Sequence, residues 1–115
     1  MLTAKPTVVV TVNGQPLRHI VRHSPTGLNW GYGGSGPADL ALSILAHYLG
    51  DPEAVDSLYQ QFKWDVIANL GDHWVLTGAE IAAWLRGQGL DVPVRDVVYE
   101  GRRMLDNPPQ WRERP

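Results

Sequence analysis

The start of the chain carries the pattern of a β-hairpin. Residues 7–12, Thr-Val-Val-Val-Thr-Val, are rich in β-branched side chains, which favour strands. Asn13-Gly14 is a strong signal for a tight turn, so residues 17–23 are expected to return as the partner strand. Because side chains alternate between the two faces of a strand, Arg18 and Arg22 would point to the same side.

Two apolar helices are predicted next along the chain. The first covers residues 37–49, is almost wholly apolar and ends at Gly50, so we expect it to be the central buried helix. The second begins with Asp51-Pro52 as its cap and first residue, and it ends at Gly71. Its apolar residues recur at helical spacing and form one stripe that would face the first helix: Val55, Leu58, Tyr59, Phe62, Val66, Ile67 and Leu70.

A third helix and a last strand complete the predicted elements. Residues 74–76 form a short extended link, and Thr77-Gly78-Ala79-Glu80 has the pattern of a capping box that opens a helix. This helix would close near Gly87 or Gly89, and residues 94–99 are expected to form the last strand. The elements together predict an α+β fold, in which a small antiparallel sheet (N-terminal hairpin plus C-terminal strand) packs against about three helices.

Length and composition agree with one folded domain. The chain has 115 residues, of which 43% are hydrophobic, so we expect a single domain over residues 1–106 and an extended basic tail over 107–115. The net charge of −2 argues against general binding to nucleic acid or to anionic membranes. The absence of cysteine excludes disulfides and thiolate chemistry, and no apolar run approaches the roughly 20 residues of a membrane span.

The most informative segment is 30–37, Trp-Gly-Tyr-Gly-Gly-Ser-Gly-Pro, which leads directly into the first helix. Two interpretations stay open. The segment is either a tight turn into a buried helix, or a pocket in which exposed amides hold an anion beside two aromatic faces. Asp39 counts against the pocket, because its carboxylate could already satisfy those amides and would repel an anion.

Known glycine motifs do not explain this segment. Gly31, Gly33 and Gly36 fit G-x-G-x-x-G, but a dinucleotide fold needs a strand–helix–strand unit, and here another helix follows. No Lys-Ser or Lys-Thr follows the glycines, which excludes the NTPase phosphate loop. The run 33–37 ends in proline where a nucleophile elbow requires glycine.

The histidines and serines do not form a predicted catalytic or metal site. His19 and His23 would lie about 13 Å apart on a strand, too far to share an ion. No acid–histidine arrangement can be inferred around a serine. We therefore expect a protein that is not an enzyme, with no metal site and no cofactor.

The run from Gly27 to Leu42, with Trp-Gly-Tyr-Gly-Gly-Ser-Gly-Pro-Ala at its centre, resembles the signature of an uncharacterised family of small phage and bacterial proteins, a domain of unknown function. The resemblance continues through 58–63 and 74–77 to Trp84-Leu85, and covers roughly residues 25–86. Asn29 and Asp39 depart from the family's usual acidic residue and glutamine. The resemblance implies a phage or mobile-element origin. The lack of cysteine, of a signal-peptide pattern and of a membrane-spanning run predicts location in the cytoplasm, of the host if phage-encoded.

These observations predict a non-enzymatic accessory protein that binds a small phosphorylated ligand, for example a nucleotide immune signal that it sequesters. Eight residues are expected to bind: Trp30 and Tyr32 stack on a base, and Gly33, Gly34, Ser35 and Gly36, with Arg18 or Arg22, hold phosphate. A homo-oligomer would enclose the ligand. The alternatives are a protein-interaction module that inhibits a host defence protein, and a virion accessory protein.

Overall fold

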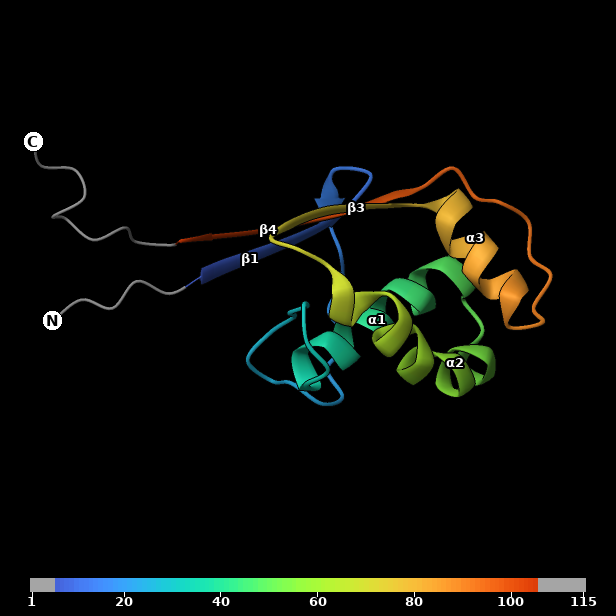
Figure 1. The fold of residues 1–115 in the computed structure, drawn as a ribbon, viewed down its shortest axis with the longest axis horizontal. Coiled ribbons are helices and arrows are strands. Elements are labelled where there is room, and N and C mark those ends of the chain that lie inside the picture. The colour runs from blue at the N-terminus through green and yellow to red at the C-terminus, as the bar shows by residue number, and fades with distance from the viewer. Residues whose placement is uncertain (1–5, 106–115) are drawn as a thin grey trace, which may run out of the picture.

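The computed structural model describes residues 6–105, so the predicted tail at 107–115 lies outside the described residues. The chain folds as an α+β domain with one antiparallel sheet and three α-helices (Figure 1). The strands are β1 (Pro6–Val12), β2 (Gln15–Pro16), β3 (His73–Thr77) and β4 (Val98–Leu105). The helices are α1 (Ser35–Leu49), α2 (Pro52–Asp65) and α3 (Gly78–Gly87), with a short 3₁₀ helix, η1 (Ile67–Asn69).

The sheet has the strand order β2-β1-β4-β3, and every neighbouring pair is antiparallel. All three α-helices lie on the same side of it (Figure 1). Side chains alternate accordingly: Trp74 and Tyr99 are buried under the helices, whereas Val75 and Val98 on the other face are 47% and 40% exposed. In the register of β1 and β4, Val8 lies opposite Arg103, so the start of β1 and the end of β4 share one end of the sheet.

The core is centred on α1, which the sequence predicts to be the buried helix. Leu40, Ile44 and Leu45 have no exposed surface, and α2 packs against α1 through Val55 and Phe62. Such burial of large aliphatic and aromatic side chains is the main source of folding free energy. None of the helices described within residues 6–105 is long and apolar enough to cross a membrane.

The predicted return strand over residues 17–23 is wrong, because the partner strand β2 contains only Gln15–Pro16. The Leu17 amide still donates to the carbonyl of Val10, at 3.0 Å. Beyond that point the backbone leaves the sheet, since the amides of residues 22–24 donate to the side chain of Asp39 in α1. A buried carboxylate has replaced the strand ladder as the partner of these amides.

Several element boundaries also differ from the prediction: α2 ends at Asp65 instead of Gly71, and β4 ends at Leu105 instead of position 99. Helix α1 begins at Ser35 instead of position 37, because Pro37 fits the first turn, where its missing N–H costs no helical hydrogen bond. Strand β4 begins at Val98 instead of position 94. The preceding residues cover the end of α1, where the Arg95 guanidinium donates to the carbonyls of His47 and Tyr48 at 2.7 Å each.

Candidate functional site

The glycines before α1 are explained by close packing. A Cβ atom on Gly33 would come within 2.1 Å of the Trp64 ring, and one on Gly36 within 2.8 Å of the Asn29 side chain. A Cβ atom on Gly34 would likewise come within 2.4 Å of the Tyr32 ring. Gly31 has φ +86°, a conformation that L side chains rarely adopt. The interpretation of the segment as a tight turn therefore accounts for its glycines without a ligand.

The two aromatic residues of the segment have opposite environments. Trp30 has no exposed surface, and its Nε1 donates to the carbonyl of Gly71 at 2.6 Å. It therefore has no face for a ligand, and the predicted stacking role of Trp30 is incompatible with its place in the core. Tyr32 is 49% exposed, and part of its ring lies against Gly34.

The N-terminus of α1 carries free backbone donors. Its cap residue is Gly34, so no side chain accepts a hydrogen bond from the first turn. Pro37 has no N–H, and the first helical bond runs from the Ala38 amide to the Gly34 carbonyl at 3.1 Å. Within residues 6–105 the amides of Ser35 and Gly36 have no hydrogen-bond partner. Two N–H groups and the positive end of the helix dipole are thus left for a ligand or for water.

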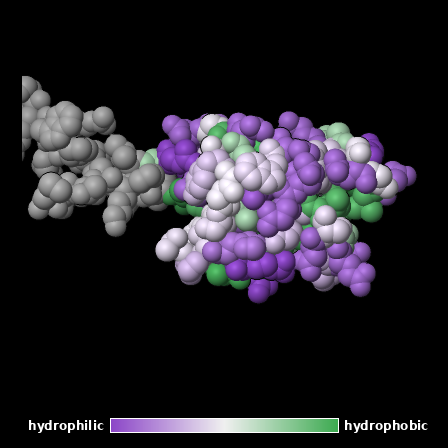
Figure 2. Space-filling view, turned by 60° about the horizontal axis from the view of Figure 1, so that its bottom comes forward, coloured by the Kyte–Doolittle hydropathy of each residue, from purple (hydrophilic) through white to green (hydrophobic). Residues whose placement is uncertain are grey.

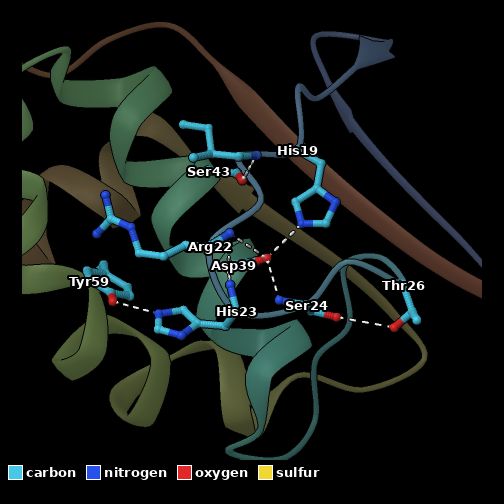
Figure 3. A network of polar contacts seen from close by, with 9 residues as sticks. His19, Arg22, His23, Ser24, Thr26, Asp39, Ser43 and Tyr59 are labelled. Atoms are coloured by element: carbon cyan, nitrogen blue, oxygen red, sulfur yellow. Dashed lines mark hydrogen bonds and ion pairs between the residues drawn. The ribbon is translucent and has the colours of Figure 1, made fainter.

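The Asp39 carboxylate does not satisfy these amides. It is fully buried and instead accepts hydrogen bonds from the amides of Arg22, His23 and Ser24, at 2.9–3.2 Å, and from Nε2 of His19 at 2.8 Å (Figure 3). Burial by itself would raise the pKa of Asp39, but these hydrogen bonds outweigh it and hold the pKa below its ordinary value. The carboxylate is therefore ionised and fastens the preceding loop to α1.

The loop held by Asp39 forms one wall of a hollow in front of α1, here called the α1 hollow. Its volume is about 470 Å³, and Val8 of β1 also borders it. Its polar lining comes from the preceding loop and from the glycine segment itself: Ser24, Thr26, Asn29, Tyr32, Ser35 and Gly36. Three of the predicted binding residues, Tyr32, Ser35 and Gly36, are thus brought together. Gly33 and Gly34 connect them but do not line the hollow.

Neither predicted arginine lies at the α1 hollow. The Arg22 guanidinium donates to Asp56 at 2.8 Å and lies over the ring of Tyr59, on the side of Asp39 away from Thr26 (Figure 3). These partners raise the pKa of Arg22, the Asp56 carboxylate most of all. Arg18 lines a different hollow of about 290 Å³, beside His47. The return strand that would have presented both side chains to one face does not form.

The histidines pair separately instead of forming a cluster. His23 lies 2.8 Å from the hydroxyl of Tyr59, and His47 lies 2.7 Å from that of Tyr99. Burial, with a smaller effect of Arg95, lowers the pKa of His47, and burial raises that of Tyr99. Across the part of the chain that the structure describes, no group of three metal-ligating side chains occurs.

Two residues beside the candidate site, Arg103 and Lys63, could not be recognised from the sequence. The Arg103 guanidinium donates to Asp72, to the Asn29 side chain and to the Trp30 carbonyl, and lies over the Trp30 ring at 4.8 Å. The Lys63 ammonium donates to the Gly33 carbonyl at 3.2 Å. Both contacts join positions at least 30 residues apart, and no local pattern signals them.

On the face drawn in Figure 2, the described residues form no broad apolar patch. Figure 2 shows a face of mixed hydrophilic and near-neutral residues, with hydrophobic residues confined to small areas. The exposed aromatic residues on the described chain are Tyr32 and Trp64, which is 57% exposed, and both rings cover glycines of the same segment.

A family model covers most of the chain. The family of unknown function DUF6166 matches residues 3–87, a range that includes the hairpin, the glycine segment and all three α-helices. Neither a curated protein nor a solved structure matches the sequence.

Proposed function

We propose that this chain, which belongs to the DUF6166 family of unknown function, binds a small phosphorylated ligand in the α1 hollow and does not catalyse its conversion. The observation that carries the proposal is the pair of amides at Ser35 and Gly36, which have no partner within residues 6–105 and belong to two residues that line this hollow. A helix N-terminus with free N–H groups attracts anions through hydrogen bonds and through the helix dipole. The volume of the hollow, about 470 Å³, suits a small molecule.

The three predicted residues that line the hollow, Tyr32, Ser35 and Gly36, each have a role in this proposal. The Ser35 and Gly36 amides, with the Ser35 hydroxyl, bind the phosphate. The half-exposed ring of Tyr32 stacks on a base or another flat group. Gly33 and Gly34 leave room for the Trp64 and Tyr32 rings beside the backbone and do not themselves bind the ligand. Trp30, Arg18 and Arg22 have no part in binding, because the first is buried and the other two lie elsewhere.

The biological setting we propose is a phage or mobile-element accessory protein that sequesters a nucleotide signal of host immunity. Its support is the glycine signature and its resemblance to small phage and bacterial proteins. A homo-oligomer and location in the cytoplasm stay predictions from the sequence. Sedimentation analysis measures the first.

The proposal is tested by placing a charge at the anion site. Ser35→Asp puts a carboxylate at an exposed position of the first turn, where it favours the helix dipole but repels an anion. We expect pyrophosphate and ADP to shift the Ser35 and Gly36 amide resonances of the natural chain, and to leave those of the variant unchanged. The matched control is Ala79→Asp, the same charge in the first turn of α3, which should bind like the natural chain. Equal binding by all three chains, or no binding by the natural one, overturns the proposal.

The role of Tyr32 is tested with two probes of different shape. Stacking of one base contributes about 1–3 kcal/mol, so Tyr32→Ala should weaken ADP binding by roughly 5- to 150-fold. Pyrophosphate has no base, and its affinity should change little. An equal loss for both probes would show that Tyr32 supports the turn and does not stack on the ligand.

The alternative function, a protein-interaction module, is favoured by the exposure of Trp64 beside Tyr32. Exposed tryptophan and tyrosine side chains are common in protein interfaces. Trp64→Ala distinguishes the two functions, because Trp64 does not line the α1 hollow and its loss should leave pyrophosphate and ADP affinity unchanged.

A further inference from the structure

One face of the sheet is not covered by any of the described helices. All three α-helices lie on the opposite side (Figure 1). Because side chains alternate along a strand, the residues between the buried ones point away from the helices. We call this surface the outer face, and it is formed by Val9 and Thr11 of β1, His73, Val75 and Thr77 of β3, and Val98, Glu100, Arg102 and Met104 of β4.

The outer face is more apolar than a sheet surface in water requires. When one face of an antiparallel sheet is solvated, its outward side chains are commonly polar. Here Val9, Val75, Val98 and Met104 are each 40–48% exposed. They are four of the eight exposed large hydrophobic residues among residues 8–104. Such a concentration of apolar side chains on one surface is typical of an interaction site.

The central strand of this face carries a pattern that is complementary to itself. The outward residues of β4 are Val98, Glu100, Arg102 and Met104, which are apolar, acidic, basic and apolar in turn. Gly101 is the midpoint of this series. If a second β4 is stacked on the first in the opposite direction, with the two glycines level, Arg102 lies over Glu100 of the other copy. Met104 then lies over Val98, and a two-fold axis repeats each contact.

The neighbouring strands fit the same arrangement. In the sheet register Val9 is level with Arg102, and Val75 is level with Glu100. Val9 would therefore meet Thr11 of the other copy, and Val75 would meet His73, so no like charges face each other. Packed sheets lie about 10 Å apart with their strands within about 30°. The long side chains of arginine and glutamate can bridge such a gap.

Charge selects this arrangement over the other two-fold one. If the axis ran along β4, Arg102 would lie over Arg102 and Glu100 over Glu100, and facing like charges are unfavourable. In the crosswise arrangement each charge meets its opposite. Within one chain Arg102 and Glu100 are already 3.6 Å apart, and His73 is 2.6 Å from Glu100. The charges that the contact would cover are thus paired, as buried charges need to be.

We propose that a second copy of this chain binds to the outer face, sheet against sheet, with the two β4 strands antiparallel. The inference does not rest on the proposed function, because the α1 hollow is lined by residues of α1 on the helical side of the sheet. Three strands give a face of roughly 15 Å by 25 Å. This is small beside the area of about 800 Å² per partner in stable complexes, so we expect a reversible dimer.

The charge pairing is tested by reversing one charge at a time. Arg102→Glu makes both central charges negative, and Glu100→Arg makes both positive. Each variant alone should dimerise at least about tenfold more weakly than the natural chain. An equimolar mixture of the two should recover the dimer, because every facing pair is again Glu with Arg. Sedimentation from micromolar to millimolar concentration measures all four samples, and recovery in the mixture also shows that both variants are folded.

The apolar contact is tested at the end of the same strand. Val98→Lys places a charge opposite Met104 of the other copy and should prevent association. The matched control is Val94→Lys, which changes a valine that is 52% exposed in the segment before β4. Val94 is not on the outer face, so this variant should dimerise like the natural chain.

Three results would overturn this inference. The first is a natural chain that stays monomeric at millimolar concentration, which would leave the outer face to another protein or to water. The second is a dimer that no variant weakens, since the copies would then meet elsewhere. The third is a mixture of the charge variants that stays monomeric. Pyrophosphate binding should be unchanged in all four variants, so its absence from the natural chain refutes the proposed function alone.

Discussion

Helices α1 and α3 both follow extended backbone and carry a carboxylate near their start, yet the two carboxylates bind different partners. In α3 the Glu80 side chain accepts from the Thr77 amide at 3.0 Å, and the Thr77 hydroxyl accepts from the Glu80 amide at 3.2 Å. This is a complete capping box. In α1 the Asp39 carboxylate accepts from the loop at 22–24 and from His19 instead.

The comparison shows how one kind of side chain can either close a helix end or leave it open. The α3 capping box is local and exposed, and it uses donors that a ligand would need. Asp39 is fully buried and is committed to another segment. The first turn of α1 therefore keeps two amides without a partner within residues 6–105, in front of a hollow that the same carboxylate helps to form.

The largest effect is expected from Asp39→Asn. The substitution removes the charge and places an NH₂ group among backbone N–H donors, so buried donors lose their acceptor. Breaking a buried ionic group in this way costs about 3–5 kcal/mol, and we expect a loss of that size in the free energy of unfolding measured with urea. A loss below about 1 kcal/mol would mean that the loop is held by other contacts.

Asp56→Asn is the matched control for this variant, since it breaks the exposed pair with Arg22, which contributes about 0–1 kcal/mol.

The pH dependence of stability provides a second test of the Asp39 carboxylate. The pKa of Asp39 lies below its usual 3.8 in the folded chain, so its contribution is complete above pH 3.8 and is lost as the pH falls through the folded value. The urea midpoint of the natural chain should drop over that range more steeply than that of Asp39→Asn.

The same contrast explains which parts of the fold the sequence predicts. The α3 start is encoded in four adjacent residues, and the Asp51 cap of α2 in two, so both are confirmed. The strand expected at 17–23 carries a correct local pattern but is wrong, because its amides bind a carboxylate 15–17 residues away. Propensity reports local preference, and a buried charge with hydrogen bonds can override it.

The same difference between local and long-range contacts decides which parts of the candidate site the sequence predicts. Tyr32, Ser35 and Gly36 could be predicted to lie together because they are neighbours in the sequence. The burial of Trp30 could not, since it depends on Gly71, Trp74 and Arg103, which come from the other half of the domain. Arg18 and Arg22 were assigned to the site only through a strand that does not form.

A smaller effect is expected from Gly36→Ala, which tests whether the turn before α1 depends on close packing. The added Cβ would meet the Asn29 backbone nitrogen at 3.2 Å and its Cβ at 2.8 Å, so the hollow's wall would have to shift. Overpacking of this kind costs about 1–3 kcal/mol in the free energy of unfolding. Gly87→Ala is the control in α3, where a Cβ meets nothing within 4 Å and should stabilise the helix by about 0.5–1 kcal/mol. Opposite signs for the two variants support the packing explanation, and equal signs contradict it.

The smallest effect is expected from Thr77→Ala, which opens the α3 capping box and so makes its first turn resemble that of α1. The loss should be about 1 kcal/mol in the free energy of unfolding, because the Glu80 amide loses its acceptor but stays in contact with water. Pyrophosphate affinity at Ser35 and Gly36 should not change, since α3 does not line the α1 hollow. New anion binding at the α3 amides would show that a free helix N-terminus is sufficient by itself. Its absence would mean that the α1 hollow, shaped through Asp39, is also required, and this is the outcome we expect.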